Sequence, residues 1–444
     1  MDETVPDPSS PATADDPAAP LVLPSQRLTR LAELTAADLR QATDTGGAGE
    51  PQVPGPRVLS ERELADVLVV VDASTAAATK AAYASDWARF TAWTTKRGFA
   101  PLPADPLVVA HYVTEAAAEP TGVGKWRYTP ATLSRWVSSI NQFHTAAGLD
   151  APGRSEVVRR ALSGVRRIRA TPPTRKAPLL LADVRTLLQH LAGMAGDWPA
   201  GVAARRDAAL LVMGFAGAYR RSELTALALG DVTLHRTDGL HVRSRTSKTD
   251  QEAHGVVKAL PYGRDPVTCP PCAYLRWREV LHAFDTAPDD DPRTRRRAVM
   301  RVLRRQDAIT APPPGGGGGG DQPDEDREVL HVCRTTRIPD TIDPDRVLFP
   351  SVHKAGAIGE RAMTGHAVNE MIKRRAGQAG FGPAQTQLLG GHSLRAGFVT
   401  EAFRAGADAH AIMRQTGHHG PGMLEVYARE HAPLVGNAVT RIGL

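Results

Sequence analysis

A chain of 444 residues is long enough for two or three domains that each bury a core. Its formal charge is +6, but residues 1–50 carry −6, which leaves +12 on the remainder and favours a polyanionic partner. Three cysteines exclude a disulfide scaffold and are typical of a reducing compartment. The sequence begins Met-Asp-Glu without a basic, apolar leader, and its longest apolar run, Ala208 to Ala218, is too short to cross a bilayer. We therefore expect a cytoplasmic protein without membrane association.

Residues 1–58 are rich in Pro, Ala, Asp and Gly, and this composition predicts a disordered acidic tail. One short helix is expected within it, from Leu28 to Arg40. We see no pattern for a folded domain in this segment.

Residues 59–170 have the periodicity of a helical domain. Aromatic and polar side chains fall on one helix face at i, i+4, i+7 and i+11, namely Tyr83, Trp87, Phe90 and Thr94. Further helices are predicted over Leu107 to Ala118, Thr132 to Ala147 and Ser155 to Val165, and Thr129-Pro130 is a start signal for the second of these. Arg166 to Pro178 mixes Arg with Pro and is interpreted as a linker. A plain helical bundle is the ordinary structural interpretation of this block.

Residues 171–444 combine helices with a small sheet. A helix is predicted from Leu181, and the apolar run Asp207 to Ala218 predicts a buried helix. The period then changes to that of strands separated by turn residues. The strands are expected at Asp231 to His235, Leu240 to Arg245 and Gly255 to Leu260. A three-stranded antiparallel sheet in a helical domain is the simplest arrangement.

An irregular insertion is expected at residues 285–343. It contains the Arg-rich stretch Arg293 to Arg305, which predicts a basic helix with Val299, Val302 and Leu303 facing inward, and a run of glycines at 315–320 that predicts a flexible linker. The basic helix either contacts phosphates or is simply solvated. Helical patterns resume over Thr364 to Ala379, Ser393 to Ala405 and Ala409 to Thr416.

Arg220 lies three residues before Glu223, so both side chains fit on one helix face. A planar guanidinium can bind two phosphate oxygens at once, although a structural ion pair at a helix start is the ordinary explanation. Leu224 and Leu227 follow and are expected to hold this helix in the core.

Four polar side chains near the C-terminus suggest chemistry. His392 and Arg395 stand at i and i+3 on a predicted helix, His418 follows a glycine, and Tyr427 comes nine residues later. Two imidazoles, a guanidinium and a phenol are the groups needed to break a phosphodiester through a covalent protein intermediate. Taken singly, each of the four has an ordinary structural explanation.

Lys248 lies in the predicted turn between the second and third strands, where a lysine can reach into a cleft as a point charge and proton donor. A surface lysine in a turn is the alternative. Lys258, in the following strand, is the weaker rival for the same role.

The motif Cys269-Pro-Pro-Cys272 raises the question of a metal or redox site. A zinc site needs four ligands, and beside this pair the sequence offers only Cys333 and scattered histidines. We therefore expect neither a metal nor a cofactor. The motif is interpreted as the proline-rich start of a helix from Ala273 to Leu281.

Taken in order, the motifs Arg, Lys, His-x-x-Arg, Gly-His and Tyr resemble the tyrosine recombinase (phage-type integrase) family, from about Ser74 to about Tyr427. The resemblance implies a mainly α fold, with a helical core-type DNA-binding domain at 59–170. It implies a mixed, mostly helical catalytic domain with a small three-stranded antiparallel sheet at 171–444.

The resemblance also assigns roles. The family's spacing selects Arg220 rather than Arg221 as the catalytic arginine, with Glu223 in support, and the nine-residue step selects His418 rather than His419.

On the family's pattern, Tyr427 attacks the scissile phosphate and forms a 3′-phosphotyrosyl link without metal or ATP. Lys248 then protonates the leaving 5′-oxygen, and His392 assists proton transfer at the tyrosine. The residues expected to hold the phosphate are Arg220, Arg395 and His418.

The implied function is site-specific recombination or integration of a mobile element. The implied partners are double-stranded DNA, three further copies of the chain in a homo-tetramer, and accessory directionality factors. The alternatives are a resolvase of plasmid or chromosome dimers in the same family, a catalytically inactive DNA-binding protein on the same fold, and a type IB topoisomerase-like enzyme.

Overall fold

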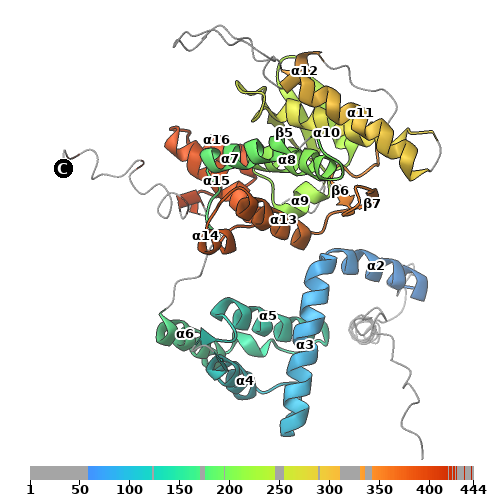
Figure 1. Cartoon of the computed structure of the whole chain (residues 1–444). Helices are drawn as coiled ribbons and strands as arrows, with labels where there is room; N and C mark the ends of the chain where they lie inside the picture. The colour runs from blue at the N-terminus through green and yellow to red at the C-terminus, as the bar shows by residue number, and fades with distance from the viewer. Residues whose placement is uncertain are drawn as a thin grey trace, which may run out of the picture. The chain divides into compact units, whose positions relative to one another are not determined.

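A computed structural model shows two compact units, Met1–Pro173 and Thr174–Leu444 (Figure 1). The residues it describes are 59–122, 125–170, 176–194, 196–245, 255–288, 291–310, 331–335, 343–418 and a few positions beyond, among them Tyr427. The predicted acidic tail with its short helix, the glycine run and Lys248 lie outside the described residues. The boundary between the units falls within the stretch predicted as a linker.

The N-terminal unit is built from helices around an aromatic core. Its helices are α2 (Glu61–Ala73), α3 (Ala77–Arg97), α4 (Pro106–Ala118), α5 (Pro130–Ala146) and α6 (Glu156–Arg169), with the short strands β1 (Pro120–Thr121) and β2 (Lys125–Trp126). Phe90 and Thr94 on α3 are fully buried, as their spacing predicted, and Trp87 stacks on Phe143 with 4.5 Å between ring centroids. Thr129 caps α5 through a hydrogen bond from the Thr132 amide at 3.2 Å.

Helix α6 is longer than the sequence indicated, because it continues through residues that were assigned to the linker. Val165 is buried, and the guanidinium of Arg169 donates to the carbonyl oxygens of Tyr128 and, at 2.6 Å, of Ala117. These contacts hold the basic end of the helix against the unit's core, which the Arg and Pro content of the segment did not reveal.

The C-terminal unit has a mostly helical framework with two small sheets. Its helices are α7 (Leu181–Gly193), α8 (Ala200–Ala216), α9 (Arg221–Thr225), α10 (Pro270–Asp285), α11 (Pro292–Thr310), α12 (Val332–Thr335), α13 (Gly365–Gln378), α14 (Pro383–Gln387), α15 (Gly391–Arg404) and α16 (Ala409–Thr416). Its strands are β3 (Val232–His235), β4 (Gly239–Ser244), β5 (Val256–Leu260), β6 (Pro350–Val352) and β7 (Ile358–Ala362). The antiparallel order β3-β4-β5 confirms the predicted three-stranded sheet, and Val242 pairs with both Val232 and Lys258 across it.

Helix α8 lies at the centre of the C-terminal unit and packs against α7, α10 and α15. Its middle is buried on all sides, which explains the nearly continuous apolar run. This helix ends directly before the turn that leads to Arg220, so the core of the unit positions that residue.

Two parts of the insertion expected at 285–343 belong to the core, and one of them is the predicted basic helix with its apolar residues facing inward. Val299 and Leu303 of α11 are fully buried, and α11 packs along α10 (Figure 1). Val332 and Cys333 of α12 join the same core cluster. The i, i+4 spacing of the two apolar residues on α11 creates a stripe that a looped-out segment would not need.

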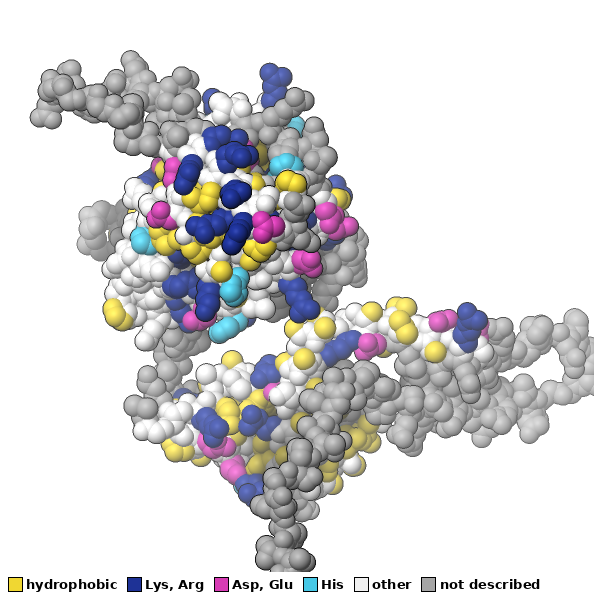
Figure 2. Space-filling model, turned by 45° about the vertical axis from the view of Figure 1, so that its right-hand side comes forward, with side chains coloured by type: hydrophobic (Ala, Val, Ile, Leu, Met, Phe, Trp, Pro, Cys, Tyr) yellow, Lys and Arg dark blue, Asp and Glu magenta, His cyan; other side chains and the backbone are white. Residues whose placement is uncertain are grey.

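The outward face of α11 is basic. Its exposed arginines are Arg293, Arg296, Arg297, Arg301, Arg304 and Arg305. Figure 2 shows Lys and Arg side chains gathered on one face of this unit. Arg305 pairs with Glu279 at 2.9 Å. Neither of the two interpretations of this helix, a phosphate contact or a solvated surface, is tested by these contacts.

Among the described residues, no single helix has both the length and the apolar character to cross a membrane. One pair, Ala65–Ala73 and Ala77–Arg97, meets that criterion only jointly, across a bend of 92°.

Candidate active site

The hydroxyl of Tyr427 lies 2.6 Å from Nε2 of His392. Tyr427 is only 5% exposed and belongs to a small apolar cluster with Val399, Ile412 and Leu424. His392 stands in the first turn of α15 and is exposed. The phenol is therefore held by packing while its oxygen meets an imidazole that solvent can reach, the arrangement that a tyrosine nucleophile and a proton acceptor require.

Arg395, one turn further along α15, is 1% exposed and held by backbone oxygens. Its Nη1 donates to the carbonyls of Ala218 at 2.8 Å and Thr416 at 2.6 Å, and its Nη2 donates to Nε2 of His418 at 2.8 Å. Burial, and then the positive charge of Arg220, lower the pKa of Arg395 to about 10. The guanidinium therefore remains charged at neutral pH although it is buried.

His418 is neutral in this arrangement. Burial, followed by the charge of Arg395, lowers the pKa of His418 to about 4. Its Nδ1 lies 2.9 Å from Oγ1 of Thr416, and that hydroxyl donates to the carbonyl of Ile412 at 2.8 Å. Nδ1–H thus donates to Thr416, and Nε2 accepts from Arg395, which assigns the tautomer.

Arg220 is oriented by Glu223. Nη1 of Arg220 donates to one carboxylate oxygen at 2.6 Å, and its backbone N–H donates to the other at 3.0 Å. The side chain of Glu223 is 4% exposed and that of Arg220 is 21% exposed. Among the described residues, no other hydrogen-bond partner contacts the Arg220 guanidinium, so its remaining N–H groups are available to an anion.

Lys258 belongs to the same cluster. It is 4% exposed, its Nζ donates to the carbonyl of Gly217 at 2.8 Å, and it lies 4.3 Å from the ring centroid of Tyr219. Burial lowers the pKa of Lys258 to about 8; the charge of Glu223 raises it, and the charges of Arg395 and Arg220 lower it further. The sequence favours Lys248 over Lys258 as the proton donor, and Lys248 lies outside the described residues.

The turn after α8 positions two of the cations. The carbonyl of Gly217 accepts from Lys258, and the next carbonyl, of Ala218, accepts from Arg395. Ala218 adopts φ +46°, a conformation that residues with a side chain rarely take. This strained turn directly precedes Arg220, so three cations gather around one short stretch of backbone.

The structure therefore brings together five of the predicted residues. These five are Arg220, His392, Arg395, His418 and Tyr427. The pair of Tyr427 and His392 lies close enough to the arginines and His418 for Tyr427 to affect the pKa of Arg395 and for His392 to affect that of His418. Glu223 joins this set through its hydrogen bonds with Arg220. The Thr416 hydroxyl, which contacts His418, and the carbonyls of Ala218 and Thr416, which accept from Arg395, were missed. Nothing in the sequence marks a lone threonine or a backbone oxygen as a partner of these side chains.

Three cations, one carboxylate and two imidazoles make this cluster a site for an anion. A phosphate bound there would meet charge that is already fixed in place, which is the main requirement for stabilising a pentavalent phosphorus.

A second cluster in the same unit could hold a metal. The sequence counted three cysteines and no specific fourth donor, and for that reason predicted no metal. The structure places His331 beside Cys269, Cys272 and Cys333, with one donor atom of each within 4.8 Å of the others. Hydrogen bonding within the cluster lowers the pKa of Cys269 and raises the pKa of Cys272 and Cys333.

Comparison with known proteins adds sequence similarity to this geometry. No protein-family model matches the chain. The chain is 28% identical over 369 residues to an integrase/recombinase xerD homolog of Selenomonas ruminantium, which covers 81% of this chain and 84% of that protein.

Solved structures that resemble the chain include the XerH site-specific recombinase bound to its difH substrate, with 13% identity, 75% of this chain and 70% of that chain covered, and a TM-score of 0.39. Another is the Tn1549 transposon integrase in complex with circular intermediate DNA, with 15% identity, coverage of 73% and 80%, and a TM-score of 0.37.

The chain is therefore similar to an integrase/recombinase over most of the length of both proteins, and this similarity accompanies the motif order found above. The motif order and the mainly helical fold with a three-stranded sheet agree with the predicted resemblance to the tyrosine recombinase family.

Proposed function

We propose that this protein cuts and rejoins double-stranded DNA with Tyr427 as the nucleophile. The contact that carries the proposal is the hydroxyl of Tyr427 at 2.6 Å from Nε2 of His392. The imidazole accepts the phenolic proton as the tyrosine oxygen attacks phosphorus. The O–P bond to tyrosine forms, the bond from phosphorus to the 5′-oxygen breaks, and the DNA remains attached through a 3′-phosphotyrosyl link.

The leaving 5′-oxygen takes a proton from a lysine. Lys248 is the proposed donor, on the family's pattern. Lys258, which lies in the same cluster as Arg220 and Arg395, is the rival for this role. Because the phosphotyrosine retains the bond energy, attack by a 5′-hydroxyl reverses the step and rejoins DNA without ATP. When that hydroxyl comes from another duplex, strands are exchanged.

Side chains supply the positive charge that phosphoryl transfer needs. Arg220 offers free N–H groups held in direction by Glu223, and Arg395 offers a buried charge fixed by two carbonyls. A phosphate that reaches Arg395 also approaches His418 and raises the pKa of that imidazole, so it can then donate to a non-bridging oxygen.

The helical N-terminal unit is proposed to bind the duplex, mainly through phosphates. Exposed arginines on α6 suit this role, among them Arg159, Arg160 and Arg166. A homo-tetramer on two synapsed duplexes, docking through the tail after Tyr427, and accessory directionality factors complete the proposal.

A pool of nicked duplexes with randomised sequence tests the nucleophile without knowledge of the target site. Cleavage near the nick releases a short fragment, so the protein stays trapped on the DNA as an adduct that survives denaturation. Tyr427→Phe should form no adduct, and Tyr262→Phe, a matched loss of a hydroxyl outside the cluster, should form as much as wild type. An adduct with Tyr427→Phe would refute the assignment, and no adduct with wild type would favour an inactive DNA-binding protein.

A further inference from the structure

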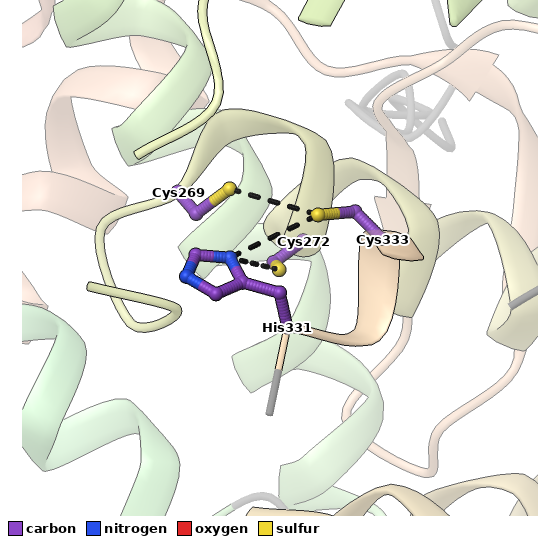
Figure 3. Close-up of side chains that lie close together, drawn as sticks. All are labelled: Cys269, Cys272, His331 and Cys333. Atoms are coloured by element: carbon purple, nitrogen blue, oxygen red, sulfur yellow. Dashed lines mark hydrogen bonds between the residues drawn. The ribbon is translucent and has the colours of Figure 1, made fainter. Parts of the chain in front are cut away.

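Four metal-ligating side chains meet at one end of α10 (Figure 3). Cys269 and Cys272 lie at the N-terminal end of this helix, while His331 and Cys333 flank the start of α12. All three sulfurs are buried, and the first and last cysteine are separated by 64 positions in the chain. The two halves of the cluster are therefore joined by folding and not by sequence.

The spacing between donor atoms matches a tetrahedron. Bonds of about 2.3 Å to sulfur and about 2.0–2.1 Å to nitrogen place neighbouring sulfurs about 3.8 Å apart and sulfur about 3.6 Å from nitrogen. Sγ of Cys269 and of Cys333 are 4.0 Å apart. Nδ1 of His331 lies 3.5 Å from Sγ of Cys272 and 3.9 Å from Sγ of Cys333.

The surroundings orient the ligands as a metal site requires. Nε2 of His331 lies 3.2 Å from the carbonyl of Arg264, which as an acceptor holds the proton on Nε2 and leaves the Nδ1 lone pair facing the sulfurs. The backbone N–H of Gly263 donates to Sγ of Cys269 at 3.3 Å. A donor aimed at a sulfur stabilises a thiolate, the form that binds metal.

We propose that Cys269, Cys272, His331 and Cys333 bind one zinc ion in a closed, structural site. Three thiolates and one imidazole are a ligand set that suits zinc, and together they complete its four-coordinate shell, so no position is left for a substrate or water. The site therefore stabilises the fold and does not take part in the strand-cleavage chemistry.

The position of the site indicates what the metal holds. The four ligands tie together two segments: the start of α10 with the connection from β5 that leads to it, and the start of α12. Gly263 and Arg264 lie in that connection, and the long stretch between Cys272 and His331 separates the two segments in the chain. Fixing both ends of that stretch limits the conformations that the unfolded and partly opened chain can adopt. The same connection leads back to β5, which carries Lys258.

Metal analysis of the full chain purified with a reductant and without chelators tests the proposal directly. We expect about one zinc per chain, whereas Cys272→Ser and His331→Ala should each lose most of it. His331→Cys replaces one zinc donor by another and should keep the metal. His241→Ala is the matched control, because His235, Asp238 and the half-buried His241 form a group near the surface that could also attract a metal.

Cobalt(II) provides a second readout that does not depend on the metal acquired during expression. Added to the metal-free, reduced chain, it should produce the sulfur-to-cobalt charge-transfer absorption of a tetrahedral thiolate site in wild type and in His241→Ala. His331→Cys should do the same, with a changed spectrum. Tyr427→Phe should bind zinc like wild type, which separates this proposal from the one on strand cleavage.

A chain that carries less than about 0.2 zinc per molecule and shows no such absorption would overturn the proposal. So would equal zinc in wild type and in both Cys272→Ser and His331→Ala, or its loss in His241→Ala alone. If the substituted chains fold poorly, the wild type decides by itself: a strong chelator should lower its unfolding temperature, and zinc should restore it. An unfolding temperature unaffected by zinc removal would argue against a structural role.

Discussion

The candidate active site and the cysteine cluster lie in the same unit, yet they use their polar atoms in opposite ways. In the active site, the carbonyls of Gly217, Ala218 and Thr416 hold buried cations in place. In the cysteine cluster, the side chains face one another and complete a coordination shell. The first arrangement concentrates positive charge that only an anion can balance, and the second leaves nothing for a further ligand.

This difference indicates where function and stability reside. A cation that is buried without an equal number of carboxylates carries a cost in folding free energy, visible in the lowered pKa values of Arg395, Lys258 and His418. A bound phosphate offsets that cost. A closed set of four ligands has no such deficit once its metal is bound, so it serves the fold.

Of the changes considered, the removal of Arg395 should have the largest effect on cleavage. Arg395→Ala deletes a charge next to the phosphate and leaves two buried carbonyls unsatisfied, so we expect cleavage to fall by about 10²–10³-fold or more and stability by roughly 3 kcal/mol. The measurement is the rate of adduct formation on the nicked duplex pool, together with urea unfolding.

Arg375→Ala separates these two effects. Arg375 is equally buried and pairs with Asp207 at 2.7 Å, away from the candidate active site. It should lose comparable stability yet retain near-normal cleavage at a temperature where both variants are folded. Equal loss of cleavage in both variants would mean that Arg395 acts only through the fold.

A better leaving group should restore cleavage to one of the two lysine variants and not to the other. A 5′-bridging sulfur leaves as a thiolate without a proton, so it should restore cleavage to Lys248→Met if that residue is the general acid. Lys258→Met should stay impaired about 10-fold, because it loses a buried charge and the contact to Gly217. Rescue of Lys258→Met alone would exchange the two roles.

Cleavage should also decline as the pH rises through about 8, where Lys258 loses its proton in the folded protein. Lys258→Met should not show this decline. The sign for stability is opposite: the unfolded chain binds the proton up to the higher ordinary pKa, so stability rises between about pH 8 and that value. A pH–rate profile and urea unfolding at pH 7 and 9 check the two signs.

The sequence predicted the elements whose pattern is local, and it failed where distant segments determine the structure. The spacing of Arg220 and Glu223 and the bounds of α16 follow from neighbouring residues. The inward stripe of α11 was predicted, but its packing partner, α10, was not, and the fourth donor of the cysteine cluster, His331, is 59 positions from Cys272. No local signal connects such residues, although the short spacing of His331 and Cys333 was visible.

The same limit applies inside the candidate active site. Motif order and the nine-residue step identified His418 and Tyr427, because both are properties of the chain. Neither feature indicated that His418 would accept a hydrogen bond from Arg395 and be neutral. That state arises from burial and from two arginines that approach through the fold.

The smallest expected effect concerns His418 and the pH dependence of stability. The lowered pKa of His418 in the folded protein, about 4, means that below its ordinary pKa the unfolded chain binds a proton that the folded chain does not. Stability should therefore fall as the pH drops from about 6.5 towards 4, and His418→Gln, which keeps an acceptor for Arg395, should fall less. Urea unfolding at pH 7 and 5 measures the difference, with the exposed His353→Gln as the control.

A covalent DNA adduct should weaken this pH dependence. The phosphate places negative charge near Arg395 and His418, so it raises the pKa of the imidazole and favours the protonated form that donates. In the adduct, the extra loss of stability in wild type relative to His418→Gln should shrink between pH 7 and 5. If it persisted unchanged, the phosphate would not reach His418, and the contrast between an anion site awaiting its ligand and a closed metal site would lose its main support.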